Sequence, residues 1–244
     1  MKNNLQATLS VLAVAVILLF TSCKEERIYG EGKVITEQRQ VDVFDKVIID
    51  LPADAEIHVG DRNSVAVKTH GNLQEYILTE VTGSTLRVYK KSGIAKLDFS
   101  KVDITIQMPS ISKLQINGAA DAKIDGDLKG ESFELHVRGA SDVDVALMHV
   151  NKLKVQLSGA SELDIHKGTV GYADYKVSGA GDIDASGLET KEVKARVSGA
   201  GDMLLHVTDK LDARISGAGE IGYTGHPEIL HSKVAGIGSI TDRN

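Results

Sequence analysis

Apolar and polar residues alternate along most of the chain. Around Gly139, for example, Leu135 and Val137 precede the glycine at intervals of two, and Val143 and Val145 follow it in the same way. A period of two is typical of β-strands that bury one face. The pattern predicts an all-β protein, and the best candidate for a helical turn is the short stretch 72–77.

Short runs of small residues interrupt the alternation at regular distances. The run "VSGAGD" at 177–182 returns at 197–202 and, as "ISGAGE", at 215–220. The first glycine of each run lies 18 to 21 residues after the previous one. Seven such corner glycines are present: Gly118, Gly139, Gly159, Gly179, Gly199, Gly217 and Gly236. A fixed period of this kind is the signature of a solenoid, in which each repeat stacks on the one before it.

The period and the local pattern decide the type of solenoid. Helical repeats need about 33 residues or more, and leucine-rich repeats need leucines and an Asn or Cys that are missing here. Each repeat instead reads as a strand, a glycine corner, a second strand and a variable stretch. Equivalent strands of stacked coils would lie about 4.8 Å apart. We therefore predict a parallel β-helix with about 20 residues per coil, right-handed because right-handed crossovers are the default.

The repeats occupy only part of the predicted domain. Residues 113–244 carry the seven corners, whereas residues 38–112 keep the alternation without them. We interpret residues 38–244 as a single β-helix domain whose first part, 38–112, forms wider and less regular coils. A separate small β domain in that first part stays open as an alternative.

The N-terminal residues read as a targeting segment. Lys2 precedes an apolar run at 12–20, and Thr21, Ser22 and Cys23 follow it in a pattern that resembles a bacterial lipobox. We predict a signal peptide at 1–22, lipidation of Cys23 and a tether over 23–37, and hence an outer-membrane lipoprotein on the cell surface or the periplasmic face. The alternative is an ordinary signal peptide followed by an incidental cysteine.

Composition narrows the picture further. Hydrophobic residues make up 42% of the 244 positions but aromatic residues only 4%, so the core has to be aliphatic. One cysteine cannot form a disulfide within the chain. The net charge is −6 and no basic run is present, which argues against nucleic acid as a partner.

An acidic residue follows each of the first six corners. In a stacked solenoid these residues form one line, which we call the acidic row: Asp121, Asp142, Glu162, Asp182, Asp202 and Glu220. The structural interpretation is that each carboxylate accepts backbone N–H groups of its own turn. The alternative is weak Ca²⁺ binding between neighbouring coils. Calcium-binding β-rolls have a shorter period and place the acid one position later, so no cofactor is expected.

Catalytic motifs are missing from the sequence. It contains no H-E-x-x-H, nucleophile elbow or phosphate-binding loop, and every Gly-x-Gly belongs to the repeat. We therefore expect a binding module rather than an enzyme, with an unidentified protein or glycan as ligand. A structural or assembly component of the cell envelope is the alternative, and a polysaccharide-active enzyme is a more remote one. The oligomeric state is not predicted.

A family resemblance adds to this interpretation. The opening "Phe44-Asp45-Lys46-Val47" and the corners "INGAAD", "RGASD", "SGASE" and "SGAGD" resemble the head domain of the auto-transporter adhesins, the GIN-domain family, over about residues 38–240. The resemblance implies a β-helical fold on a secreted or lipid-anchored protein of Gram-negative bacteria. It implies no catalytic residues.

Overall fold

The computed structural model describes residues 27–94 and 96–244. The predicted signal peptide and Cys23 lie outside these residues. Strands make up 72% of the structure and helix 3%, and the coils stack into a β-solenoid of about six turns with about 20 residues each. The all-β parallel solenoid predicted from the sequence is therefore confirmed. Over the described ranges, no helix is both long and apolar enough to cross a membrane.

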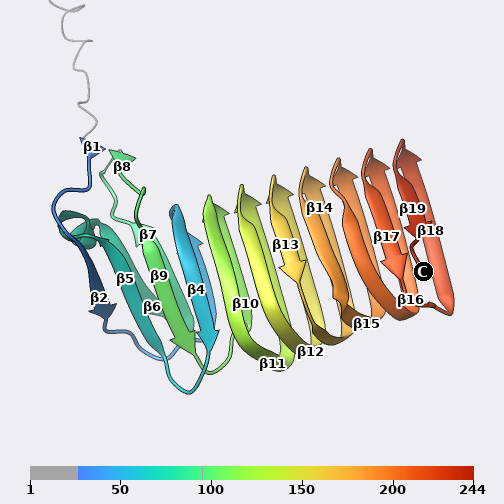
Figure 1. The fold of residues 1–244 in the computed structure, drawn as a ribbon, viewed down its shortest axis with the longest axis horizontal. Helices are drawn as coiled ribbons and strands as arrows, with labels where there is room; N and C mark the ends of the chain where they lie inside the picture. Colours follow the sequence, from blue (N-terminus) through green and yellow to red (C-terminus); the bar gives the residue numbers. More distant parts are fainter. Residues whose placement is uncertain (1–26, 95) are drawn as a thin grey trace, which may run out of the picture.

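The strands fall into an irregular N-terminal region and a regular region (Figure 1). The irregular region contains β1 (Arg27–Ile28), β2 (Val34–Arg39), β3 (Lys46–Asp50), β4 (Ala53–Val59), β5 (Ser64–His70), the 3-10 helix η2 (Gly71–Tyr76), β6 (Ile77–Thr82), β7 (Thr85–Lys90), β8 (Lys96–Leu97) and β9 (Asp103–Met108). The regular region contains β10 (Lys113–Gly118), β11 (Ala120–Gly139), β12 (Asp142–Gly159), β13 (Glu162–Ile165), β14 (Gly168–Gly179), β15 (Asp182–Gly199), β16 (Met203–Gly217), β17 (Glu220–Thr224), β18 (Ile229–Gly236) and β19 (Ser239–Asp242).

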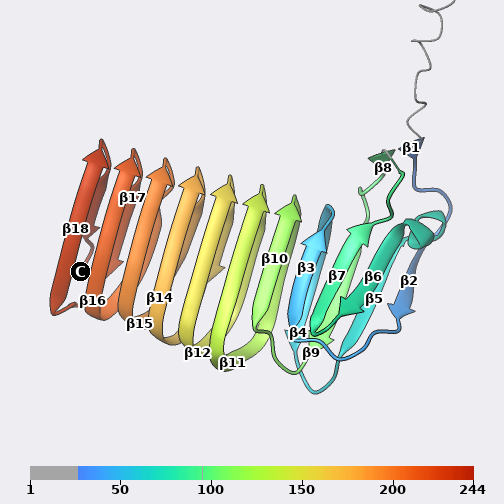
Figure 2. The same cartoon turned by 180° about the vertical axis from the view of Figure 1, so that it is seen from behind.

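The regular region is a stack of parallel coils. The seven corner glycines pair with one another in register from β10 to β18, so that every corner lies directly on the previous one. We name two sides of each coil: the leading side ends at a corner, and the trailing side begins after it. Figure 1 and Figure 2 view the stack from opposite directions.

The interior consists of rows of aliphatic side chains. One row runs through Val137, Leu157, Val177, Val197 and Ile215, which are all at most 2% exposed. Burying a side chain of this size contributes about 1.5–3 kcal/mol. Because inward and outward residues alternate, every second residue of a coil is left on the surface, in register with its counterparts in the neighbouring coils.

The irregular region corrects one expectation from the sequence. β3 and β4 stack in parallel on β10 and β11, and β7 and β9 continue these two sides. However, β2 and β5, β5 and β9, and β6 and β7 are antiparallel pairs. Residues 38–112 therefore do not form coils throughout. Short turns such as Gly83 reverse the chain within a few residues, which is enough for a hairpin but not for a crossover.

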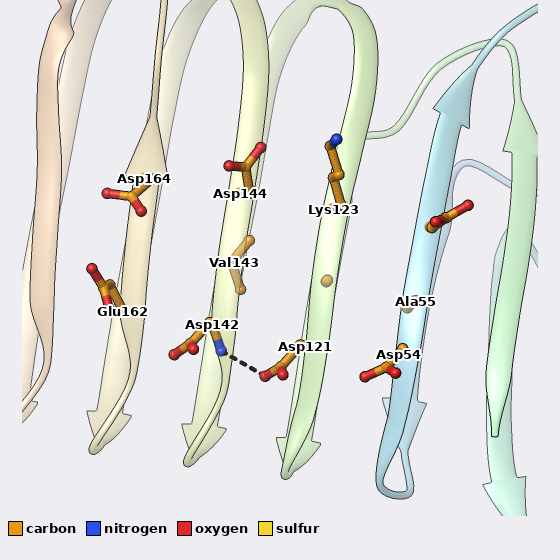
Figure 3. A pocket seen from close by; sticks show the side chains of 11 residues that line it. Asp54, Ala55, Asp121, Lys123, Asp142, Val143, Asp144, Glu162 and Asp164 are labelled. Carbon is orange, nitrogen blue, oxygen red and sulfur yellow. Dashed lines mark hydrogen bonds between the residues drawn. The ribbon is translucent and has the colours of Figure 1, made fainter. Parts of the chain in front are cut away.

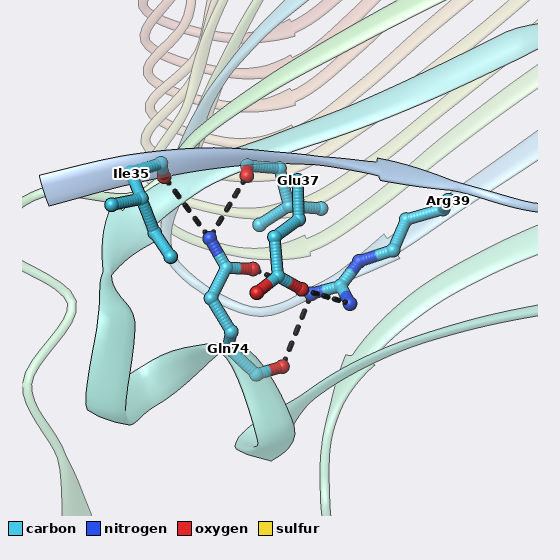
Figure 4. Close-up of polar contacts among 5 residues, drawn as sticks. Ile35, Glu37, Arg39 and Gln74 are labelled. Carbon is cyan, nitrogen blue, oxygen red and sulfur yellow. Dashed lines mark hydrogen bonds and ion pairs between the residues drawn. The ribbon is translucent and has the colours of Figure 1, made fainter.

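The predicted tether is ordered from Arg27 onwards, which is a second correction. β1 pairs with β8, and β2 pairs with β5. Figure 4 shows how η2 holds β2: the Gln74 amide donates to the Ile35 carbonyl at 3.1 Å, and Arg39 donates to Oε1 of Gln74 at 2.6 Å. Gln74 is only 4% exposed, so this buried amide is satisfied by the strand that it anchors.

Candidate functional site

The corner glycines are required by the stacking. Gly179 has a φ of 131°, and a Cβ at this position would collide with the carbonyl oxygen of Gly159 in the previous coil. The next residue, Ala180, donates its N–H to that same carbonyl at 2.8 Å. The other corners repeat this bond at 2.8–3.0 Å, from Ala140 to Ile237. Backbone hydrogen bonds thus fix the corner tightly, and the residues just after it start every trailing side at the same height.

The position two residues after the corner glycine changes along the stack. Ser141 and Ser161 are buried there, and their hydroxyls donate to the carbonyls of Gly118 at 3.4 Å and Gly139 at 3.2 Å. In later coils glycine takes this position, as at Gly201, where a Cβ would collide with the carbonyl of Gly181. Where serine occupies this position, its buried hydroxyl is satisfied by a carbonyl of the previous coil.

The acidic row lies on the trailing side, with its members in register from coil to coil. The sequence suggested that each carboxylate accepts N–H groups of its own turn. The structure corrects this expectation, because the hydrogen bonds run to the next coil. Asp121 instead accepts the N–H of Asp142 at 3.0 Å, Asp182 that of Asp202 at 2.8 Å, and Asp202 that of Glu220 at 2.7 Å. The reason is that the next coil offers an N–H one strand spacing away, within reach of a short carboxylate side chain. Three members of the row therefore link neighbouring coils.

A second acidic row, Asp144, Asp164 and Asp184, lies two residues further along the same side. The carboxylate of Asp164 raises the pKa of Glu162, with burial and the neighbouring acids adding to the effect. Burial and the Asp184 carboxylate raise the pKa of Asp164, against an opposing effect of His166. His166 contacts Asp144 at 2.7 Å between Nε2 and Oδ2. Like charges thus repel one another at the centre of this side.

A shallow groove of about 390 Å³ runs across the start of the two acidic rows (Figure 3). Carboxylates of Asp54, Asp121, Asp142 and Glu162 border it, and Lys123 is its one cation. In Figure 3 the four carboxylates lie next to one another on separate strands, and Lys123 shares its strand with Asp121. Within residues 27–94 and 96–244, no three His, Cys, Asp or Glu side chains are grouped so that they could hold a metal ion. This surface can attract cations through its charge, but it presents no assembled ligand set.

The leading side, on the opposite face, carries a row that the sequence analysis missed. We call Lys176, Arg196, Arg214 and Lys233 the basic row; each pairs in register with the next. A groove of about 280 Å³ runs beside this row, and Ser198 and Ser216 contribute to its lining. The signal was present in the sequence, because each of these cations stands three residues before a corner glycine. The earlier coils have Gln115, His136 and Gln156 at that place, which hides the pattern.

The comparisons with known proteins agree with this architecture. A crystal structure described as a "putative adhesin" from Bacteroides fragilis matches with a TM-score of 0.84 and 26% identity, over 88% of this chain and 99% of that one. A crystal structure described as a "putative lipid binding protein" from Parabacteroides distasonis matches with a TM-score of 0.74 and 26% identity, over 90% of this chain and 100% of that one. A "putative adhesin" from Parabacteroides merdae matches with a TM-score of 0.73, over 90% of this chain and 100% of that one. Its identity is 23%, so it shows the fold alone. No curated protein matches.

A family model described as "Putative auto-transporter adhesin, head GIN domain" matches residues 43–227. The match covers most of the irregular region and the coils from β10 to β17. The adhesin names point to the cell surface and away from enzymes. The chain belongs to the family of auto-transporter adhesins with a head GIN domain.

Proposed function

We propose that this chain is a lipid-anchored adhesin that binds a ligand outside the cytoplasm and catalyses no reaction. The observation that carries the proposal is the exposure of both sides of the solenoid. In the described part of the chain the one helix, η2, lies at the N-terminal end, and no helix or long loop covers the sides of the regular region. Rows of outward side chains repeated from coil to coil provide an extended surface for recognition.

The anchor is proposed from the sequence at the N-terminus. Cys23 follows an apolar run, and only a few residues separate it from β1. β1 and β8 lie at the end of the molecule that also carries η2 (Figure 1). A lipid on Cys23 would thus hold the irregular region next to the membrane and leave the regular region accessible.

The arrangement of the acids favours binding over catalysis. A glycosidase needs one carboxylic acid and one carboxylate on either side of a bound sugar. The acids of the trailing side instead line up along one strand position per coil, and three of them are occupied by backbone N–H groups. The adhesin names of the related structures support the same conclusion.

Surface exposure and anchoring can be tested together on intact cells. We expect added protease to degrade the wild-type protein, and cells lacking the gene to lose attachment to at least one surface of a glycan- and protein-coated panel. Cys23→Ala should move the protein from the membrane to the soluble fraction and abolish attachment. Glu31→Gln, an exposed change in the same N-terminal segment, is the matched control.

Two results would contradict the proposal. Complete protection from protease on intact cells would indicate an inward-facing structural component of the envelope instead. Unchanged attachment of the gene-deletion strain on every surface would exclude an adhesin role in that panel's ligand classes.

A further inference from the structure

We infer that the basic row is a binding face for an acidic polysaccharide that carries carboxylates on its sugars. The inference rests on the proposed adhesin function and names its ligand class. It concerns the leading sides of the last four coils, formed by β14, β15, β16 and β18.

The geometry presents the cations as a straight, evenly spaced line. Lys176 pairs with Arg196, Arg196 with Arg214, and Arg214 with Lys233 in the parallel ladders. Neighbouring members are therefore about 4.8 Å apart at the backbone. Lys176, Arg214 and Lys233 are exposed, and Arg196 is half-buried. A linear polymer with repeated negative charges can contact several members at once.

The local charge is positive in a protein whose net charge is −6. Two carboxylates stand in the adjoining row: Asp174 pairs with Arg196 at 3.0 Å, and Asp212 pairs with Arg214 at 3.1 Å. Among the described residues, Lys176 and Lys233 have no hydrogen-bond or ion-pair partner. The two arginines show that this row accepts carboxylate oxygens, and the two lysines leave positive charge available for a ligand.

The groove beside the row fits the other groups of a sugar. The four cations line it together with Ser198 and Ser216, and the lining surface is predominantly apolar. Serine continues in the same row at Ser158 and Ser178. Hydroxyls can bond to sugar hydroxyls, aliphatic stems can pack on ring carbons, and the cations can bind carboxylates. This combination fits an acidic polysaccharide better than a polyanion that has no sugar rings or hydroxyls.

A second copy of the chain fits less well, although its acidic rows have the opposite charge and the same spacing. The trailing side is itself hollowed by the 390 Å³ groove, so two concave faces would meet. Asp121, Asp182 and Asp202 already accept backbone N–H groups, and Asp144 contacts His166. Nucleic acid is disfavoured because no aromatic side chain lines the basic groove for base stacking.

The test uses the full chain, purified in mild detergent, and three probes. Polygalacturonate carries a carboxylate on each sugar, its methyl ester has the same backbone without the charge, and poly-glutamate has the charge without the sugar. We expect polygalacturonate to bind at low salt and to weaken strongly as salt rises. The ester and poly-glutamate should bind at least tenfold more weakly.

Substitutions locate the face. Lys176→Gln/Lys233→Gln removes two cations that have no protein partner, so the fold should be retained. We expect its Kd for polygalacturonate to rise about tenfold. Lys123→Gln/Lys129→Gln removes two cations from other sides of the coils, where they pair with Asp125 and Asp127, and should leave Kd within twofold.

Three outcomes would overturn the inference: an unchanged Kd in the first variant, equal binding of the ester, or equal binding of poly-glutamate. The last would indicate an acidic polypeptide, which includes the acidic rows of a second copy. If the Lys176→Gln/Lys233→Gln cells still attach while the gene-deletion strain does not, the adhesin function stands and this binding face is wrong.

Discussion

The irregular and regular regions solve the same packing problem in different ways. Both bury one face of most of their strands, and β3 and β4 stack directly on β10 and β11. The irregular region reverses the chain with hairpins. The regular region repeats one corner seven times and fills its interior with aliphatic rows.

The surface charges show what repetition costs. In the irregular region, some charges are neutralised across strands: Asp50 forms an ion pair with Arg87 at 2.5 Å, and Asp103 forms one with its in-register neighbour Lys68 at 2.7 Å. Like charges also meet there, because Asp54 is in register with Asp103. In the regular region, copying a coil copies its charge, which produces the acidic rows on one side and the basic row on the other. Repetition therefore extends one sign along these particular rows, whereas the row of Asp174, Lys194 and Asp212 alternates in sign.

The largest expected effect is on stability, and it distinguishes a corner of the regular region from a hairpin turn of the irregular region. Gly179→Ala should destabilise the protein by about 3 kcal/mol or more, because it forces a side chain into a positive φ and against the Gly159 carbonyl. Gly83→Ala should cost only about 1 kcal/mol, because its φ is 61° and a Cβ there meets nothing within 4 Å. Urea denaturation followed by circular dichroism measures both. Equal losses in the two variants would show that the corner stacking is not what restricts position 179.

Much of this architecture was predictable from the sequence because it repeats. The alternation predicted the strands, the spacing of Gly139 to Gly236 predicted the coils, and the stretch 72–77 overlaps η2. The antiparallel pairs of the irregular region were missed because that region has no internal copy to compare with. The partner of each acid was also missed: sequence order shows which residues share a turn, but the N–H that Asp182 accepts comes from the next coil.

The basic row was missed for a different reason. A repeated acid at a fixed corner is conspicuous, whereas the basic row begins only at Lys176 and mixes lysine with arginine. Its meaning depends on which residues lie opposite one another across coils. The grooves and the pairing of Arg196 with Asp174 are properties of the stacked coils and have no signature in one repeat.

Tyr175 is where the regular region departs from its own pattern, and it supports the second prediction. It lies in register between Val155 and Ala195 and is 1% exposed, and among the described residues its hydroxyl has no partner within hydrogen-bond geometry. The Thr190 hydroxyl nearby donates to the Leu188 carbonyl at 3.2 Å instead. Burial raises the pKa of Tyr175 and outweighs a smaller lowering effect of the nearby Thr190 hydroxyl, which is consistent with a mainly apolar site. Tyr175→Phe should therefore stabilise the protein by up to about 1 kcal/mol.

Thermal melting of the two proteins checks this prediction. The matched change Tyr223→Phe lies in β17, where the tyrosine is 8% exposed, and should shift Tm less. A clear loss of stability in Tyr175→Phe would mean that the hydroxyl has a partner, such as a buried water, and that this position is not merely a large filler.

Charge repulsion in the acidic rows supports a smaller, pH-dependent effect. The folded-state pKa values of Glu162 and Asp164 lie above their usual values, so the native protein takes up protons before the unfolded chain as pH falls. These two groups should therefore raise stability between neutral pH and their usual pKa values. Asp164→Asn should stabilise the protein by a few tenths of a kcal/mol at pH 7 and reduce this rise.

The control variant should change stability in the opposite direction. Asp174→Asn removes the carboxylate that pairs with Arg196, so it should lower Tm slightly at pH 7. Melting curves from pH 7 down to pH 5 distinguish the two changes. A Tm of Asp164→Asn that is below wild type at pH 7 would show that attraction, for instance to His166, outweighs the repulsion.

The smallest expected effect is the change in Tm on adding divalent cations. It distinguishes a surface that is only charged from one that holds a bound ion. In the described residues no three carboxylates are grouped to hold a metal ion, so Ca²⁺ and Mg²⁺ should act by screening the acidic rows. Millimolar amounts of either ion should then raise Tm slightly and by the same amount, and Asp182→Asn/Asp202→Asn should reduce both shifts equally. A ligand bound only by the native state would behave differently, because it raises Tm in proportion to its own affinity. A shift produced by Ca²⁺ alone, and lost in the double variant, would mean that adjacent coils do assemble a calcium site between their carboxylates.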